Sequence, residues 1–96
     1  MMRRIVKMKF REKEVESFLA LFEKVKLKII GREDCHSLEL VKGFDGQTFF
    51  TISTWKDETA LNEYRNSEMF KDTWAIVKSL LEEKAEAWST ETLFKK

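Results

Sequence analysis

The segment Thr48–Tyr64, TFFTISTWKDETALNEY, contains the pattern that decides the fold. Its first half is rich in β-branched and aromatic residues, which suit the half-buried surface of a strand, and we expect this strand to end at Trp55. Asp57 follows as a good helix N-cap, and Leu61 and Tyr64 stand three residues apart on one helical face. The segment therefore predicts a strand that turns at a tryptophan into a helix, a corner that can frame a pocket.

The residues before this segment predict a strand, a helix and a second strand. Residues 4–10, RIVKMKF, alternate apolar and basic side chains as a half-buried strand does. From about Glu12 to Ile30, apolar residues recur every three or four positions, which indicates an amphipathic helix, and Gly31 is expected to end it as a left-handed cap.

The next stretch, CHSLELV, again alternates with a period of two. This period places His36, Leu38 and Leu40 on one face of a strand and Cys35 on the other. The glycines and the aspartate of residues 43–46 are typical of a hairpin. We therefore expect this strand and the strand of TFFTISTW to be antiparallel neighbours.

The last third of the chain predicts a further helix and a last strand. Residues 66–68 indicate a break and a new N-cap, and a second apolar stripe follows them, while residues 85–93 alternate as a strand does. The order of elements is β-α-β-β-α-β, with the second helix in two pieces. This order predicts an α+β fold of the ferredoxin-like type, an antiparallel sheet with helices on one face.

Composition narrows the class of protein. A chain of 96 residues can bury one hydrophobic core, so we expect a single domain over residues 1–96. Eighteen basic and 17 acidic residues give a net charge of +1 without a basic patch, which argues against a nucleic-acid partner. No apolar run can cross a membrane or resembles a secretory signal, and the single cysteine, Cys35, suits a reducing compartment. We therefore expect a cytoplasmic protein with no membrane partner.

The sheet face that carries no helices must also be covered. It has Lys7 and Lys9 but also apolar positions of the last two strands. A second copy packed sheet to sheet would cover this face, and the two sheets could close into a barrel. The sequence therefore predicts a homodimer with the form of a dimeric α+β barrel.

Three motifs of this chain are distinctive: the Cys-x-Ser-Leu-Glu-Leu strand, the tryptophan that ends TFFTISTW, and the Ser-Glu-x-Phe start of the next helix. Together they resemble the antibiotic biosynthesis monooxygenase family of the dimeric α+β barrel superfamily, from Ile5 to about Leu93. The resemblance implies a ferredoxin-like homodimer with a pocket between sheet and helices. It also implies a monooxygenase that acts on a small electron-rich aromatic or quinol-like substrate without metal or flavin.

Such chemistry needs an apolar cavity with one or two polar groups near an acidic hydroxyl, because a phenolate or enolate can itself give an electron to dioxygen. The candidate catalytic residues are His36, because histidine is the most common general base in enzymes, and Tyr64. The residues expected to contact the substrate are apolar or aromatic, with one amide: Val6, Met8, Phe22, Leu38, Leu40, Trp55, Asn62, Phe70 and Trp74.

Each candidate also has a structural interpretation. His36 follows a polar loop, where a surface histidine is ordinary, and Asn62 is expected to be solvated. Tyr64 and Trp74 fall on the apolar stripes of their helices, where aromatic residues usually belong to the core. Trp55 can pack at the corner instead of donating a hydrogen bond to a ligand.

Two other functions are alternatives to oxygenation. Haem-degrading members of the superfamily have Asn, Trp and His at positions that correspond here to Val6, Tyr64 and Trp74, and none matches, so haem binding is disfavoured. No group of His, Cys, Asp and Glu has the spacing of a metal site, and no cofactor is expected. A non-catalytic dimer that binds a small ligand stays an alternative, because a fold does not fix a function.

Overall fold

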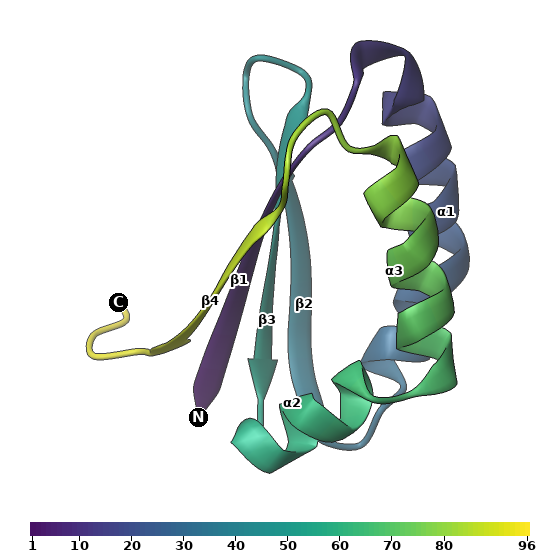
Figure 1. Cartoon of the computed structure of the whole chain (residues 1–96). Helices are drawn as coiled ribbons and strands as arrows, with labels where there is room; N and C mark the ends of the chain where they lie inside the picture. Colours follow the sequence, from purple (N-terminus) through teal and green to yellow (C-terminus); the bar gives the residue numbers. More distant parts are fainter.

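The computed structural model describes residues 1–96 as one antiparallel sheet with all helices on the same side of it (Figure 1). The elements in chain order are β1 (Met2–Lys9), the 3-10 helix η1 (Glu12–Glu14), α1 (Val15–Ile30), β2 (Cys35–Lys42), β3 (Thr48–Trp55), α2 (Glu58–Arg65), α3 (Glu68–Leu80) and β4 (Glu86–Glu91).

The four strands lie in the order β2-β3-β1-β4, and every neighbouring pair is antiparallel. In this register Val6 of β1 lies opposite Thr51 of β3 on one side and Ala87 of β4 on the other. The sequential strands β2 and β3 form the predicted hairpin, and α1 and α3 cross the same sheet face (Figure 1). The predicted ferredoxin-like α+β fold is confirmed.

Two side-chain caps separate the helical region after β3 into two helices, as predicted. Asp57 Oδ1 accepts a hydrogen bond from the backbone N–H of Ala60 at 2.8 Å, which begins α2. Ser67 Oγ accepts a hydrogen bond from the backbone N–H of Phe70 at 3.2 Å, which begins α3. Each cap satisfies a donor that the first turn of a helix leaves without a partner.

Gly31 ends α1, but the predicted left-handed cap is wrong. Its φ angle is −74°, in the right-handed region, and its N–H donates to the carbonyl of Leu27 at 3.0 Å. A Cβ atom at this position would lie 2.9 Å from the Leu27 oxygen. Glycine is needed here for a close approach of backbone, and Gly46 in the hairpin is the residue with a positive φ.

A β-bulge at the start of β2 corrects the predicted faces of that strand. Cys35 lies opposite Trp55 while Ser37 lies opposite Thr54, so one residue of β2 has no counterpart in β3. Cys35 is therefore buried against Trp55 on the same side as Leu38, and His36 is exposed. Burial raises the pKa of the Cys35 thiol, as expected for a small buried apolar residue.

The core between sheet and helices consists of two clusters. The first surrounds Trp55 at one end of the sheet, and its other buried members are Val25, Ile29, Cys35, Ala60 and Leu61. The second surrounds Phe10, Phe18 and Phe49 at the other end, with Met8 and Val77. The core is therefore divided, and the cavity described below lies between its two parts.

The opposite face of the sheet has no helix over it. Ile5 of β1 lies between Ile52 of β3 and Trp88 of β4, and this apolar row continues into Phe50 and Val41. Trp88 is 45% exposed. No helix of the structure is both long enough and apolar enough to pass through a membrane.

Candidate functional site

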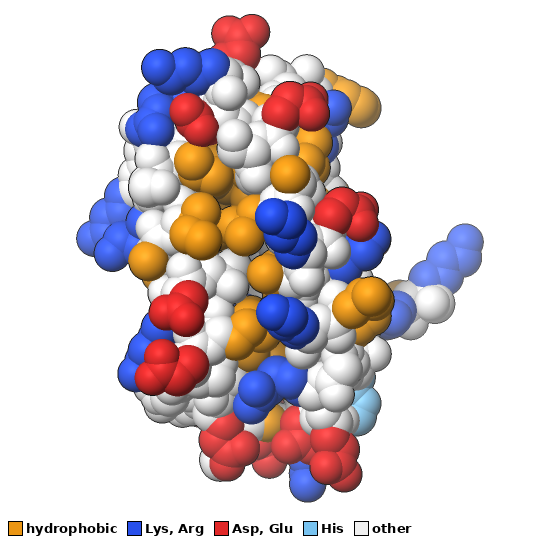
Figure 2. Space-filling model, turned by 90° about the vertical axis from the view of Figure 1, so that its right-hand side faces the viewer, with side chains coloured by type: hydrophobic (Ala, Val, Ile, Leu, Met, Phe, Trp, Pro, Cys, Tyr) orange, Lys and Arg blue, Asp and Glu red, His pale blue; other side chains and the backbone are white.

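A cavity of about 260 Å³ lies between the helices and the sheet, and fifteen of the 20 residues that line it are hydrophobic. Its walls include Phe18 and Val77 from one core cluster and Val25 and Trp55 from the other. Seen from the helix side, the surface shows apolar side chains between rows of charged ones (Figure 2). The cavity therefore occupies the gap between the two halves of the core.

Small side chains on the sheet make room for this cavity. Alternate residues of a strand point to the same face. The residues of β3 that face the helices are Phe49, Thr51, Ser53 and Trp55, with the large rings at the two ends and the small side chains between them. On β4, Ala87 continues the floor with another small side chain.

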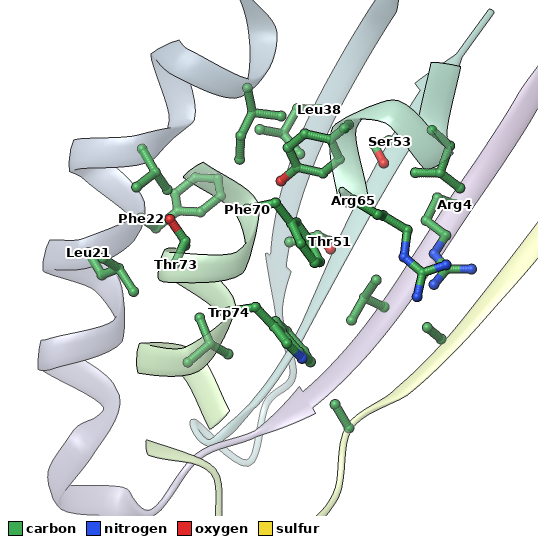
Figure 3. Close-up of a pocket in the computed structure, with 18 of the residues that line it drawn as sticks. Arg4, Leu21, Phe22, Leu38, Thr51, Ser53, Arg65, Phe70, Thr73 and Trp74 are labelled. Carbon is green, nitrogen blue, oxygen red and sulfur yellow. The ribbon is translucent and has the colours of Figure 1, made fainter. Parts of the chain in front are cut away.

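Four aromatic rings form one wall of the cavity. Trp55 stacks on Tyr64 with ring centroids 4.9 Å apart, and Tyr64 meets Phe70 edge-on at 5.0 Å. Phe70 in turn lies parallel to Trp74 at 6.1 Å. This row runs from the end of β3 across α2 to α3, so the predicted strand-to-helix corner does border the cavity (Figure 3).

Tyr64 is the phenol of this wall. Burial raises the pKa of Tyr64 to about 12, and the guanidinium of Arg32, 5.6 Å from its ring centre, opposes that rise only in part. Its hydroxyl makes no hydrogen bond within the chain, although its ring is held between Trp55 and Phe70. A protonated hydroxyl of this kind can donate a hydrogen bond to a ligand in the cavity.

The indole N–H of Trp55 is already bonded. It donates to Ser53 Oγ at 2.9 Å in a buried contact between two residues of β3. Because a buried indole N–H needs a partner, Ser53 fixes the orientation of the ring at the corner. Trp55 therefore offers its face to the cavity and keeps its donor within the protein.

Two arginines are the charged residues of the lining. Arg4 comes from β1 and Arg65 from the last residue of α2, and their side chains extend toward each other beside Thr51 and Trp74 (Figure 3). Arg4 Nη1 donates to Ser89 Oγ on β4 at 2.9 Å. One end of a largely apolar cavity thus carries positive charge.

Most of the residues predicted to bind substrate or act on it do line this cavity. They are Val6, Phe22, Leu38, Trp55, Tyr64, Phe70 and Trp74. Four others lie elsewhere. Met8 is buried in the Phe10 cluster, and Leu40 packs against that cluster. His36 is exposed at the bulge of β2, and Asn62 is exposed on α2.

The polar and the small residues of the lining were not predicted from the sequence patterns. Arg4 begins the alternating stretch of β1 and lies on the same face as Val6. The two-residue period of the strand was therefore enough to predict on which side of the sheet Arg4 lies. Arg65 follows Tyr64 and lies one turn after Leu61. The signal that could have located the floor is the small pair Thr51 and Ser53 between two large rings.

The chain offers little to hold a metal or haem at this site. No group of three His, Cys, Asp and Glu side chains is placed to hold a metal ion. The single imidazole, that of His36, lies outside the cavity. What the site can do is bind an apolar aromatic molecule, donate one phenolic hydrogen bond and attract negative charge.

Comparison with known proteins agrees with this picture. The sequence profile of the antibiotic biosynthesis monooxygenase family matches residues 1–75. The chain belongs to this family. No curated protein matches the chain.

Solved structures share the fold of this family member. An antibiotic biosynthesis monooxygenase superimposes with a TM-score of 0.91 at 16% identity, covering 97% of this chain and 99% of its own. Rv0793 from Mycobacterium tuberculosis has a TM-score of 0.90 at 20% identity, and the match covers 98% of this chain and 96% of Rv0793. A protein from Methanosarcina mazei Go1 has a TM-score of 0.88 at 19% identity, and the match covers 93% of this chain and 89% of that protein. At these identities the likeness establishes the fold alone.

Proposed function

We propose that this protein is a cofactor-independent monooxygenase that oxygenates a small electron-rich aromatic or quinol-like molecule in the cavity between sheet and helices. The observation that carries the proposal is the row of four aromatic rings along an apolar cavity of about 260 Å³, one of which, Tyr64, is a phenol without a hydrogen-bond partner in the chain. Family membership supports it. Flat aromatic walls suit a planar ring, and an apolar site favours release of the ring's electrons to dioxygen in a water-poor space.

Tyr64 is proposed to orient the reacting oxygen of the substrate. Because burial raises the pKa of Tyr64 to about 12, the hydroxyl stays protonated at neutral pH and donates a hydrogen bond. Such a donor stabilises an oxyanion that develops on the substrate. His36 has no part in this proposal, because it lies outside the cavity.

The substrate supplies all the electrons in the proposed reaction. A hydroxylated ring loses its phenolic proton and then passes electrons to dioxygen, and a C–O bond forms at a ring carbon. One oxygen atom stays on that carbon as a carbonyl. The other leaves as water, with the ring hydrogen and the phenolic proton, so that a phenol and dioxygen give a quinone and water.

We also propose that residues 1–96 form a single domain and that the protein works as a homodimer, as family members usually do. The uncovered sheet face supports this, since it presents the row of Trp88, Ile5 and Ile52 to solvent. Substituting Ile52→Glu in the middle of that row should lower the mass measured by sedimentation toward that of a monomer. An Ile52→Glu variant that keeps a dimer would place the interface elsewhere.

A second candidate function is binding without catalysis. One observation favours it: the phenol of the cavity has a pKa of about 12, too high for it to act as a base at neutral pH. In that case the cavity would hold a small aromatic ligand, and any chemistry would need another group.

Oxygen consumption separates the two candidates. Metal-stripped protein with a chelator is mixed with a panel of dihydroxy-aromatics and quinols. We expect protein-dependent uptake that persists in the chelator and falls by about a hundredfold in Tyr64→Phe, the loss expected when one oxyanion donor is removed. Binding of the same compounds without any uptake would favour the non-catalytic candidate.

A further inference from the structure

The paired arginines are the part of the cavity that oxygenation does not explain. Arg4 and Arg65 come from different elements, β1 and α2, yet their guanidinium groups meet at one end of the lining (Figure 3). The rest of the cavity is largely apolar. A positive end on an apolar cavity indicates what part of a ligand goes there.

No acidic side chain balances these two charges. The salt bridges of the chain are Lys9–Glu82 and Lys26–Glu23, both away from the arginines. Arg4 has one side-chain hydrogen bond, to the neutral hydroxyl of Ser89 at 2.9 Å, and Arg65 has none. Burial lowers the pKa of Arg4, and the charge of Arg65 lowers it further. Arg4 is half-buried and Arg65 is exposed, and their two like charges repel each other, so an anion between them would be bound favourably.

Structural roles explain each arginine alone but not the pair. Arg65 lies in the last turn of α2, where a positive charge complements the helix dipole. Arg4 could serve only to bond Ser89 across the β1–β4 pair. Neither role requires the two guanidinium groups to converge, and a position on the outer side of α2 would serve Arg65 as well.

The chemistry of guanidinium identifies the partner. Its planar fork of N–H donors matches the two oxygens of a carboxylate or of a phosphate, and charged bonds of this kind are stronger than neutral ones. We propose that Arg4 and Arg65 together bind an oxyanion, a carboxylate or a phosphate monoester, carried by the aromatic ligand of the cavity. This inference rests on the proposed function, because it takes the aromatic row as the site of the ring. The ligand class is then an aromatic acid or aryl phosphate.

Calorimetric titration with three small probes tests this assignment. Salicylate and salicylamide share a hydroxylated ring and differ in the charge of one substituent, and phenyl phosphate carries the other oxyanion. We expect salicylate or phenyl phosphate to bind at least about tenfold tighter than salicylamide, as charged hydrogen bonds warrant. The anion whose affinity exceeds that of salicylamide by the larger factor indicates whether the natural ligand carries a carboxylate or a phosphate.

Charge-removing variants locate the effect. Arg4→Gln and Arg65→Gln should each reduce the preference for the anion, measured as the ratio of its affinity to that of salicylamide in the same variant, to about twofold or less. Lys71→Gln is the matched control, because it removes one positive charge from an exposed position of α3 outside the lining. It should keep the full preference. Circular dichroism of each variant establishes that it is folded.

The outcomes separate this inference from the proposed function. If neither salicylate nor phenyl phosphate binds the unsubstituted protein more tightly than salicylamide does, the oxyanion site is overturned and the aromatic cavity is left standing. A preference that survives in both arginine variants would also overturn it. If none of the three probes binds, the cavity is not an aromatic site, and the proposed function fails as well.

Discussion

The two ends of the core both use aromatic rings, yet one is closed and the other is open. Phe10, Phe18 and Phe49 form a triangle in which every pair is in contact, with centroids 4.2, 5.7 and 5.3 Å apart, and none is more than 3% exposed. The rings from Trp55 to Trp74 instead form a row, each in contact with its neighbours only. A triangle fills space, whereas a row makes a wall.

The difference is set by what lies opposite the rings. At the closed end the sheet contributes Met8 and Phe49, which reach up to Phe18 of α1. Toward the open end, between Phe49 and Trp55, it contributes Thr51 and Ser53, which are too short to reach the helices and leave the cavity above them. The same sheet face thus supplies stability at one end and a binding volume at the other.

The first prediction tests the closed end. Phe10→Ala should lower the free energy of unfolding by about 3–5 kcal/mol, because the ring is fully buried in the triangle and its removal leaves a void. Urea unfolding at a fixed protein concentration measures the change. A loss below about 1 kcal/mol would mean that this end is not tightly packed and would remove the contrast between the two ends.

The second prediction concerns pH at the open end. The pKa of Tyr64 is about 12 in the folded protein and near 10.0 when the chain is unfolded. Between these values the folded state holds a proton that the unfolded state has lost, so stability falls as the pH rises from 10 to 12. The fall attributable to Tyr64 is roughly 2 kcal/mol.

Tyr64→Phe is the control for this effect, because it keeps the ring and removes the ionisable group. Unfolding free energies of the two proteins are compared across that pH window. The stability of the unsubstituted protein relative to that of Tyr64→Phe should fall toward high pH, and ultraviolet absorbance should show one phenolate appearing with its midpoint near 12. A midpoint near 10 would show that the hydroxyl is solvated and the wall is loose.

The third prediction separates binding from packing. Trp74→Ala should cost about 1–2 kcal/mol of stability, less than a fully buried ring, because Trp74 is half-buried and has the cavity on one side. Affinity for a small aromatic probe should fall at least about tenfold, because the ring that ends the row is gone. Equal binding by the folded variant would remove Trp74 from the site.

Much of the fold was predictable because it depends on local signals. The alternation of β1, the caps at Asp57 and Ser67 and the apolar stripes each act within a few residues, and each appears in the structure as expected. The faces of β2 could not be predicted in this way, because the bulge depends on how that strand pairs with β3. That one-residue shift exchanged Cys35 and His36 between core and solvent.

The cavity was predictable only in part for a similar reason. Its aromatic wall could be inferred because Trp55, Tyr64 and Trp74 stand on patterned faces. The pairing of Arg4 with Arg65 depends on where α2 lies relative to the strands of the sheet, which no spacing along the chain reveals. Small floor residues were missed because periodicity registers large apolar side chains and treats small ones as neutral.

The last prediction concerns a substitution that fills the cavity, so that the open end becomes packed like the closed end. Thr51→Leu places a large side chain on the floor, between Val6 and Leu40 of the neighbouring strands. Filling the cavity adds apolar contact and removes a hydroxyl that makes no hydrogen bond, so stability should change by less than about 1 kcal/mol in either direction. Binding of the aromatic probe should nevertheless be lost. Thr51→Ser, which keeps the floor low, is the matched control and should bind as the unsubstituted protein does. If Thr51→Leu binds normally, the ligand does not occupy the space above β3, and the contrast between the two ends concerns packing alone.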